Sequence, residues 1–307
     1  MKKGLIIQGP LVSQGRTGKA VNTAFKELTE KDVVNYNCVK NIAKIYKNYS
    51  HLFDEVICVT WIDQDKNLID ELLEICGKEN VLLIKDTTAF IQEQNSLIAG
   101  NNKLRQFLST LEGAEKLKDR GCEVTLKIRT DQYLDCEKIM NSYNESLALD
   151  DKKSSALFVP WKNASNSYSI TEIPDMYFVG STKLIIEYSS IMLKDQEISR
   201  HVHTDIFYKV LHRKCFKGKF GFYKYRFLNK CGNVYPLWRD VEIAWSLYFS
   251  PLDKEIIDTI IWRGEKMELP LSYKNYWSAN NNSPLPKLSY IGSLIKIMKI
   301  SIKNLKR

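Results

Sequence analysis

Apolar and polar positions follow two patterns along the first half of the chain. Short apolar or β-branched runs have the length of buried strands, whereas longer segments repeat apolar residues at steps of three or four, as amphipathic helices do. The strand-like runs are Gly4–Gln8, Glu55–Thr60, Val81–Ile84 and Val124–Ile128. The helix-like segments are Asn35–Leu52, Asn67–Cys76 and Asn101–Leu117. This alternation predicts an α/β fold with a mostly parallel sheet flanked by helices, and a ligand site at the carboxyl ends of its strands.

The second half of the chain is less regular and has no internal repeat. The predicted strands are Ala156–Pro160 and Met176–Val179, the predicted helices are Thr182–Leu193 and Asp205–Leu211, and Gly218–Tyr225 is predicted as an aromatic hairpin. Ser278–Pro286 has the Ser, Asn and Pro content of a flexible joint. We therefore expect one catalytic domain over residues 1–277, followed by a joint and a separate tail over residues 278–307.

The composition fits a folded protein that meets phosphate groups. The hydrophobic and charged fractions, 44% and 26%, are those of ordinary globular chains, which argues against disorder. The net charge of +9 gathers in two stretches without acidic residues: Ile206–Lys230 holds eight Lys or Arg, and Lys287–Arg307 holds six. Such stretches suit nucleotides, lipid pyrophosphates or an anionic membrane surface. No recognisable nucleic-acid-binding signature is present, so nucleic acid is not an expected partner.

Two further features bear on the location of the protein. The apolar run after the charged start, Leu5–Ile7, is too short for an export signal, and no run approaches the roughly 20 apolar residues that cross a bilayer. The seven cysteines are scattered without C-x-x-C spacing, which predicts small core residues rather than disulfides or a zinc ribbon. These features predict a cytoplasmic protein, free or peripheral to the membrane.

Gly15–Lys19 superficially resembles a phosphate-binding loop. That motif needs a further glycine where Ser13 stands, and a hydroxyl after the lysine where Ala20 stands. A nucleoside triphosphatase is therefore not expected.

The strand-like run Val124–Ile128 leads to Arg129, Thr130 and Asp131. An acid at the carboxyl end of a strand can hold a divalent cation against a diphosphate and neutralise charge as a sugar departs. Lys127 and Arg129 are two residues apart, so both basic side chains project from one face of the strand. The alternative is a structural ion pair between Arg129 and Asp131.

Six short motifs follow one another between residues 5 and 210. They are Ile7-Gln8-Gly9-Pro10; Val59-Thr60-Trp61; Asn102, Arg105, Gln106, Ser109, Thr110 and Gly113; Lys127, Arg129, Thr130 and Asp131; Asp175 to Ser181; and His203 to Phe207. In order and spacing they resemble the WavE-type lipopolysaccharide-synthesis family, which is described as a family of bacterial glycosyltransferases.

The resemblance implies a GT-A-like fold and transfer of a sugar from a nucleotide-sugar donor to a lipid-linked saccharide of lipopolysaccharide or capsule. The donor-binding residues that it implies are Gln8, Gly9, Pro10, Trp61, Asn102, Arg105, Gln106, Lys127 and Arg129. It also implies an acidic motif for Mn²⁺ or Mg²⁺ at Arg129–Asp131. Because Arg129 stands where such folds usually carry the first acid of D-x-D, only Asp131 is left to meet the cation.

Residues further along the chain could complete this chemistry. His201 and His203 would face the same side of an extended stretch and could join Asp131 around a cation; otherwise they lie exposed at a helix start. An inverting transferase also needs a general base to deprotonate the acceptor hydroxyl. The candidates are Asp205 and Asp175, followed by Asp240 and Glu242.

The tail carries apolar and cationic residues at helical spacing. The apolar positions are Leu288, Ile291, Ile295, Met298, Ile302 and Leu305, and the cationic ones are Lys296, Lys299, Lys303 and Lys306. This pattern predicts an amphipathic helix lying on an anionic bilayer, at the inner face of the bacterial inner membrane, where a lipid-linked acceptor would be. The alternative is a helix packed on the catalytic domain with its lysines in solvent.

Two other functions stay open at this point. A similar scaffold could transfer another activated group, such as a polyol phosphate or a nonulosonic acid. A protein of another class, a non-catalytic glycan- or membrane-binding assembly factor, would share the basic surface without the chemistry.

Overall fold

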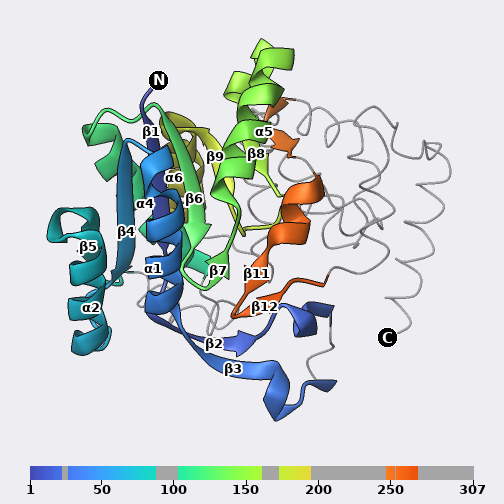
Figure 1. The fold of residues 1–307 in the computed structure, drawn as a ribbon. Coiled ribbons are helices and arrows are strands. Elements are labelled where there is room, and N and C mark those ends of the chain that lie inside the picture. The colour runs from blue at the N-terminus through green and yellow to red at the C-terminus, as the bar shows by residue number, and fades with distance from the viewer. Residues whose placement is uncertain (23–26, 88–102, 161–172, 195–246, 253, 269–307) are drawn as a thin grey trace, which may run out of the picture.

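The computed structural model describes residues 1–22, 27–87, 103–160, 173–194, 247–252 and 254–268. These residues form a seven-stranded sheet with helices on both faces (Figure 1). Its strands are β1 (Lys3–Gln8), β4 (Glu55–Trp61), β5 (Val81–Ile84), β6 (Val124–Arg129), β8 (Leu157–Val159), β9 (Phe178–Ser181) and β10 (Phe249–Pro251). They lie in the order β10-β8-β9-β6-β1-β4-β5.

The sheet is mostly parallel. The four strands β5, β4, β1 and β6 run parallel to one another, and β10 runs parallel to β8. Strand β9 is antiparallel to both of its neighbours, β6 and β8. Numbered along the chain, the strand order is 3-2-1-4-6-5-7, so it reverses between β1 and β6. The predicted α/β class, with a mostly parallel sheet flanked by helices, is confirmed.

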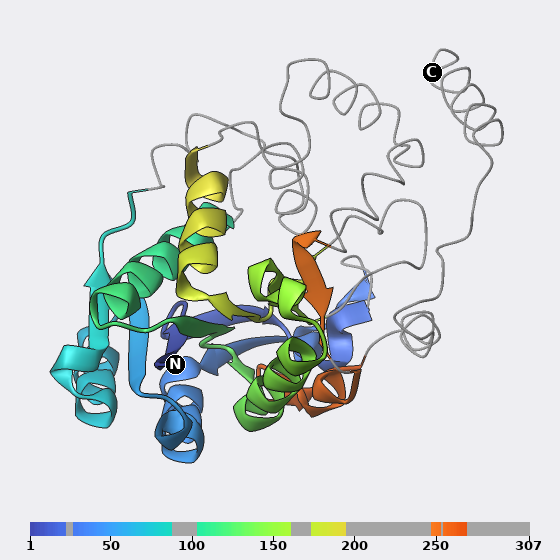
Figure 2. The same ribbon diagram turned by 90° about the horizontal axis from the view of Figure 1, so that it is seen from above.

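Each face of the sheet has its own helical layer (Figure 2). Alternate residues of β1 divide between the layers: Leu5 and Ile7 pack in one apolar cluster, and Ile6 packs in the other. The first cluster includes residues of α1 (Cys38–Tyr49), α2 (Lys66–Cys76) and α5 (Cys136–Leu149). The second includes residues of α4 (Lys103–Asp119) and α6 (Thr182–Lys194). No helix in the described ranges is long and apolar enough to cross a membrane.

Local capping explains where α1 begins and where α2 ends. The Asn37 side chain accepts hydrogen bonds from the backbone N–H groups of Val39 and Lys40, at 2.9 and 3.4 Å, so α1 begins at Cys38. The predicted helix start at Asn35 is therefore wrong, because Val33–Asn37 is strand β3. The end of α2 at Gly77, whose φ is 81°, is confirmed.

Two small sheets lie below the carboxyl end of the main sheet in Figure 1. Strands β2 (Val12–Arg16) and β3 (Val33–Asn37) pair antiparallel. Strand β11 (Ile261–Trp262) pairs antiparallel with both β7 (Gln132–Tyr133) and β12 (Glu265–Lys266). Neither sheet was among the elements predicted from the sequence, and α5 was also missed.

Several predictions concern residues outside the described ranges. They are the helix Asp205–Leu211, the hairpin Gly218–Tyr225, the joint Ser278–Pro286 and the C-terminal amphipathic helix. The boundary between residues 277 and 278 lies there as well. Among described residues, Cys38, Cys58, Cys76, Cys122 and Cys136 are all buried, which confirms the core role expected for them.

Candidate functional site

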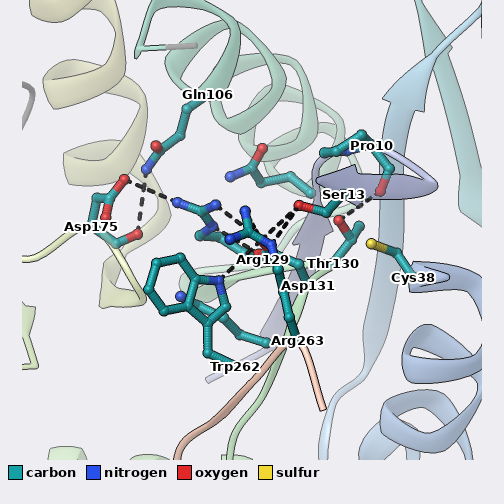
Figure 3. A network of polar contacts seen from close by, with 12 residues as sticks. Pro10, Ser13, Cys38, Gln106, Arg129, Thr130, Asp131, Asp175, Trp262 and Arg263 are labelled. Carbon is teal, nitrogen blue, oxygen red and sulfur yellow. Dashed lines mark hydrogen bonds and ion pairs between the residues drawn. The ribbon is translucent and has the colours of Figure 1, made fainter. Parts of the chain in front are cut away.

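Polar side chains from several elements meet at the carboxyl edge of the main sheet (Figure 3). The parallel strands β1 and β6 end there, at Gln8 and Arg129. Because β9 is antiparallel to β6, the segment entering β9, with Asp175, approaches the same edge. This edge includes the point where the strand order reverses, which is where open α/β sheets bind ligands.

The centre of the cluster is the carboxylate of Asp131, which is 2% exposed. Arg129 donates to it from Nε at 3.0 Å and from Nη2 at 3.2 Å. Ser13 Oγ donates at 2.9 Å and Trp262 Nε1 at 3.1 Å, and Arg263 Nη2 lies 3.0 Å from Oδ2. Burial raises the pKa of Asp131, but the guanidinium groups of Arg129 and Arg263 outweigh it and lower the pKa to about 2.

Arg263 reaches this carboxylate from the turn between β11 and β12. Its φ is 48° and that of Gly264 is 86°, the left-handed pair that a tight two-residue hairpin turn requires. Its Nε donates to Ser13 Oγ at 3.0 Å and its Nη1 to the carbonyl oxygen of Arg16 at 2.7 Å. The turn thereby connects the β2–β3 sheet to Asp131. Ser13, Trp262 and Arg263 belong to this candidate site, and no sequence pattern indicated them.

Arg129 also connects β6 to the segment before β9. Its Nη1 lies 3.4 Å from Asp175 Oδ2, so the guanidinium sits between two carboxylates, as Figure 3 shows. The backbone carbonyl of Asp175 accepts hydrogen bonds from Lys127 Nζ at 2.7 Å and from Gln106 Nε2 at 3.3 Å. Lys127 and Arg129 therefore project from one face of the strand, as predicted. The Arg129 side chain keeps 25% of its surface exposed.

Lys127, in contrast, is fully buried. Burial lowers the pKa of its ammonium to about 7, against the opposing field of Asp175. Its Nζ lies 4.9 Å from the centre of the Phe178 ring. Because the amine is enclosed and already donates to Asp175, its described contacts hold the strand and this segment together.

The loop after β1 is fixed by internal hydrogen bonds. The backbone N–H groups of Gly9 and Thr130 donate to the carbonyl oxygens of Val59 and Gln8, at 3.1 and 3.0 Å. Thr130 Oγ1 donates to the carbonyl oxygen of Pro10 at 2.8 Å. Gly9 has φ of 140°, and a Cβ there would lie 2.6 Å from Thr130 Oγ1, so glycine is required. The side chain of Gln8 is buried and accepts from Ser109 of α4 at 2.6 Å.

A second arginine lies on α4, whose amino end faces the same edge. Arg105 Nε donates to Asp86 Oδ2 at 2.5 Å, just after β5. Its guanidinium carbon lies 5.3 Å from the centre of the buried Trp61 ring, at the end of β4. The Arg105 side chain is 36% exposed. Cationic side chains with exposed surface therefore stand at two places along the carboxyl edge.

The contacts of Asp131 bear on the predicted metal site. A divalent cation at this carboxylate would meet the positive charge of Arg129 and Arg263 at hydrogen-bonding distance, so the described donor set does not fit a cation there. No group of three or more His, Cys, Asp or Glu among the described residues could hold a metal ion. His201 and His203, like Asp205 and Asn102, lie outside the described residues. The three-residue site therefore stays a prediction, while the ion pair considered as its alternative is present.

No protein-family model and no curated protein sequence matches the chain. Among solved structures, a cytidylyltransferase from Leptospira borgpetersenii is similar at 13% identity and a TM-score of 0.37, over 100% of this chain and 96% of that chain. A mannose-1-phosphate geranyltransferase from Thermus thermophilus is similar at 9% identity and a TM-score of 0.32, over 68% of each chain. Likenesses this distant carry no argument about activity. The WavE-type resemblance accordingly stays a prediction.

Proposed function

We propose that this protein is a nucleotide-sugar-dependent glycosyltransferase. The observation that supports the proposal most is the position of Arg129, a partly exposed guanidinium at the reversal point of a doubly wound sheet. Nucleotide ligands bind at that point in such sheets, and a guanidinium suits their phosphate groups. Arg105, on the same edge, offers a second cation, and the motifs around both residues are those of the WavE-type resemblance.

The proposed acceptor is supported by the sequence alone. A lipid-linked saccharide of lipopolysaccharide or capsule would fit the two basic stretches and the amphipathic tail, and an enzyme peripheral to the inner membrane would meet such an acceptor. Asp175 is the candidate general base that the structure describes; the other candidates, Asp205, Asp240 and Glu242, lie outside the described residues. An acid beside the acceptor hydroxyl would take its proton as the new glycosidic bond forms.

A thermal-shift screen of the full chain against UDP, GDP, CDP and CMP tests the donor half. A ligand at about 100 times its Kd stabilises the folded state by about 2.7 kcal/mol, which raises the melting temperature by several degrees. We expect a rise with one nucleoside diphosphate. A rise with CMP alone would favour transfer of a nonulosonic acid instead. No rise with any of the four would contradict the proposal and favour a non-catalytic assembly factor.

A further inference from the structure

The loop after β1 does not offer backbone donors to a phosphate. In dinucleotide-binding sheets, a glycine-rich turn at this place presents free N–H groups to the pyrophosphate. Here Gly9 N–H donates to Val59, Leu11 N–H donates to Gln64 Oε1 at 2.9 Å, and Pro10 has no N–H. This loop therefore supplies no backbone donors to a diphosphate, and the cationic side chains at the same edge are another source of donors.

Arg129 can supply such donors even though it is ion-paired. A guanidinium carries five N–H groups. Three of them are engaged: one on Nε and one on Nη2 by Asp131, and one on Nη1 by Asp175. The other two, one on each terminal nitrogen, have no partner among the residues that the structure describes. They give the guanidinium two further donors for the oxygens of a phosphate.

The charges around this position balance closely, so exposure decides which group can meet an anion. Arg129 and Arg263 face the two carboxylates of Asp131 and Asp175, and the buried amine of Lys127, whose pKa is about 7, adds part of a positive charge. Arg263 has 9% of its side chain exposed, and the Asp131 side chain has 2%. Asp131 and Arg263 are therefore enclosed, and Arg129, at 25%, has the largest exposed fraction of the three side chains.

We propose that Arg129 binds the donor's diphosphate in place of a divalent cation, and that Asp131 and Arg263 are positioning residues that fix its guanidinium. This inference rests on the proposed function, because it names the group within the same donor site that meets the phosphates. It assigns to a fixed arginine the charge neutralisation that a bound metal supplies in other transferases.

Isothermal titration of the full wild-type chain tests this without any substitution. The probes are UDP, GDP, CDP and inorganic pyrophosphate, each titrated in EDTA and again in excess Mn²⁺. We expect the tightest probe to bind in EDTA with a Kd within about 3-fold of its value in Mn²⁺, since a difference of that size is under 1 kcal/mol. Binding that requires Mn²⁺ would overturn the inference and leave the proposed function standing. Absence of binding under both conditions would overturn the proposed function as well.

Variants then ask whether the bound anion is at Arg129. Arg129→Gln should weaken binding in EDTA by about 10-fold or more, and Arg129→Lys should fall between, because lysine keeps the charge but loses the planar fork. Asp131→Glu should recover affinity lost in Asp131→Asn when both are measured where they are folded. Lys116→Gln, an exposed residue on α4, is the charge-matched control and should bind as wild type. Wild-type affinity in Arg129→Gln would overturn the assignment.

Discussion

Arg129 donates to both carboxylate oxygens of Asp131, from Nε at 3.0 Å and from Nη2 at 3.2 Å, although the two residues are separated by only Thr130 along the chain. These two hydrogen bonds, made within one strand end, fix the plane of the Arg129 guanidinium. Asp175 contacts the same guanidinium from the segment before β9, at 3.4 Å. A cation held in this way needs little reordering when it meets an anion, which is the condition for efficient electrostatic stabilisation.

Asp131→Asn should destabilise the folded protein by about 3 kcal/mol or more, because it removes the buried counter-charge that Arg129 and Arg263 share. Urea unfolding at pH 7 measures this difference. The control is Asp70→Asn, at an exposed position of α2, which should change stability by less than about 0.5 kcal/mol. Equal stability of the two variants would show that the buried pair contributes nothing.

The stability difference between wild type and Asp131→Asn should depend on pH. The pKa of Asp131 falls from its ordinary value of 3.8 to about 2 on folding, so its ionised form stabilises the fold above pH 4, and that contribution is lost between pH 4 and 2. The stability gap between wild type and Asp131→Asn should therefore be constant above about pH 5 and narrow as the pH falls towards 2. A gap that is unchanged across this range would contradict the ionised, paired state.

Gly9→Ala should destabilise the protein by about 1–3 kcal/mol, because it combines a backbone conformation costly for alanine with a contact of 2.6 Å to Thr130 Oγ1. Gly121→Ala is the matched control: its φ is 83°, but a Cβ there meets nothing within 4 Å. Thermal unfolding of both variants separates the conformational cost from the clash. The Gly9 variant should melt at the lower temperature, and the reverse order would contradict the contact.

Asp175→Asn should lower kcat for transfer by about 100-fold or more if its carboxylate is the general base, because base catalysis contributes at least that factor in many enzymes. Nucleotide affinity should change much less, since Arg129 keeps both hydrogen bonds to Asp131 and the Asp175 backbone carbonyl still accepts from Lys127 and Gln106. Steady-state kinetics and titration on the same protein separate the two effects. Retained turnover would rule out Asp175 as the base and leave Asp205, Asp240 and Glu242 as candidates.

Replacing Lys296, Lys299, Lys303 and Lys306 together by Gln, in the full chain, should abolish sedimentation with anionic liposomes. Each lysine near such a surface contributes about 1 kcal/mol, so four substitutions remove most of the electrostatic attraction. Lys40→Gln, Lys44→Gln and Lys47→Gln combined, on the exposed face of α1, form the control and should leave sedimentation unchanged. Loss of sedimentation in the α1 variant alone would indicate that α1, and not the tail, contacts the membrane.

The parallel half of the sheet could be predicted because it is local. Strands β1, β4, β5 and β6 are short, mostly apolar runs separated by amphipathic helices. The pattern of apolar residues in each element can be recognised from a short stretch of sequence. The predicted helix start, Asn35, lies three residues before the observed start at Cys38, because the Asn35–Asn37 stretch continues the polar pattern of the helix. Only the antiparallel pairing of β3 with β2 shows that it is a strand.

The enclosure of Asp131 could not be predicted because it depends on pairings across the whole chain. Trp262 and Arg263 lie more than a hundred residues from Asp131 along the chain. Trp262 ends a strand of two residues, which is too short to show a period, and Arg263 follows it in the turn. The one local signal is Arg263-Gly264 between two short runs, which is compatible with a tight hairpin turn. The sequence pattern places an acid at the end of β6. The tertiary fold brings the second arginine, Arg263, to that acid beside Arg129.

The most direct measurement is the release of nucleoside diphosphate from the nucleotide sugar whose nucleotide binds tightest. Wild type and Lys116→Gln are compared with Arg129→Gln, all in the presence of a saccharide acceptor. We predict release by wild type and by the Lys116 control, and a rate at least about 100-fold lower for Arg129→Gln, the loss typical of removing one donor to developing charge. Release by Arg129→Gln at the wild-type rate, or no release from any nucleotide sugar by wild type, would contradict a donor site at this edge of the sheet.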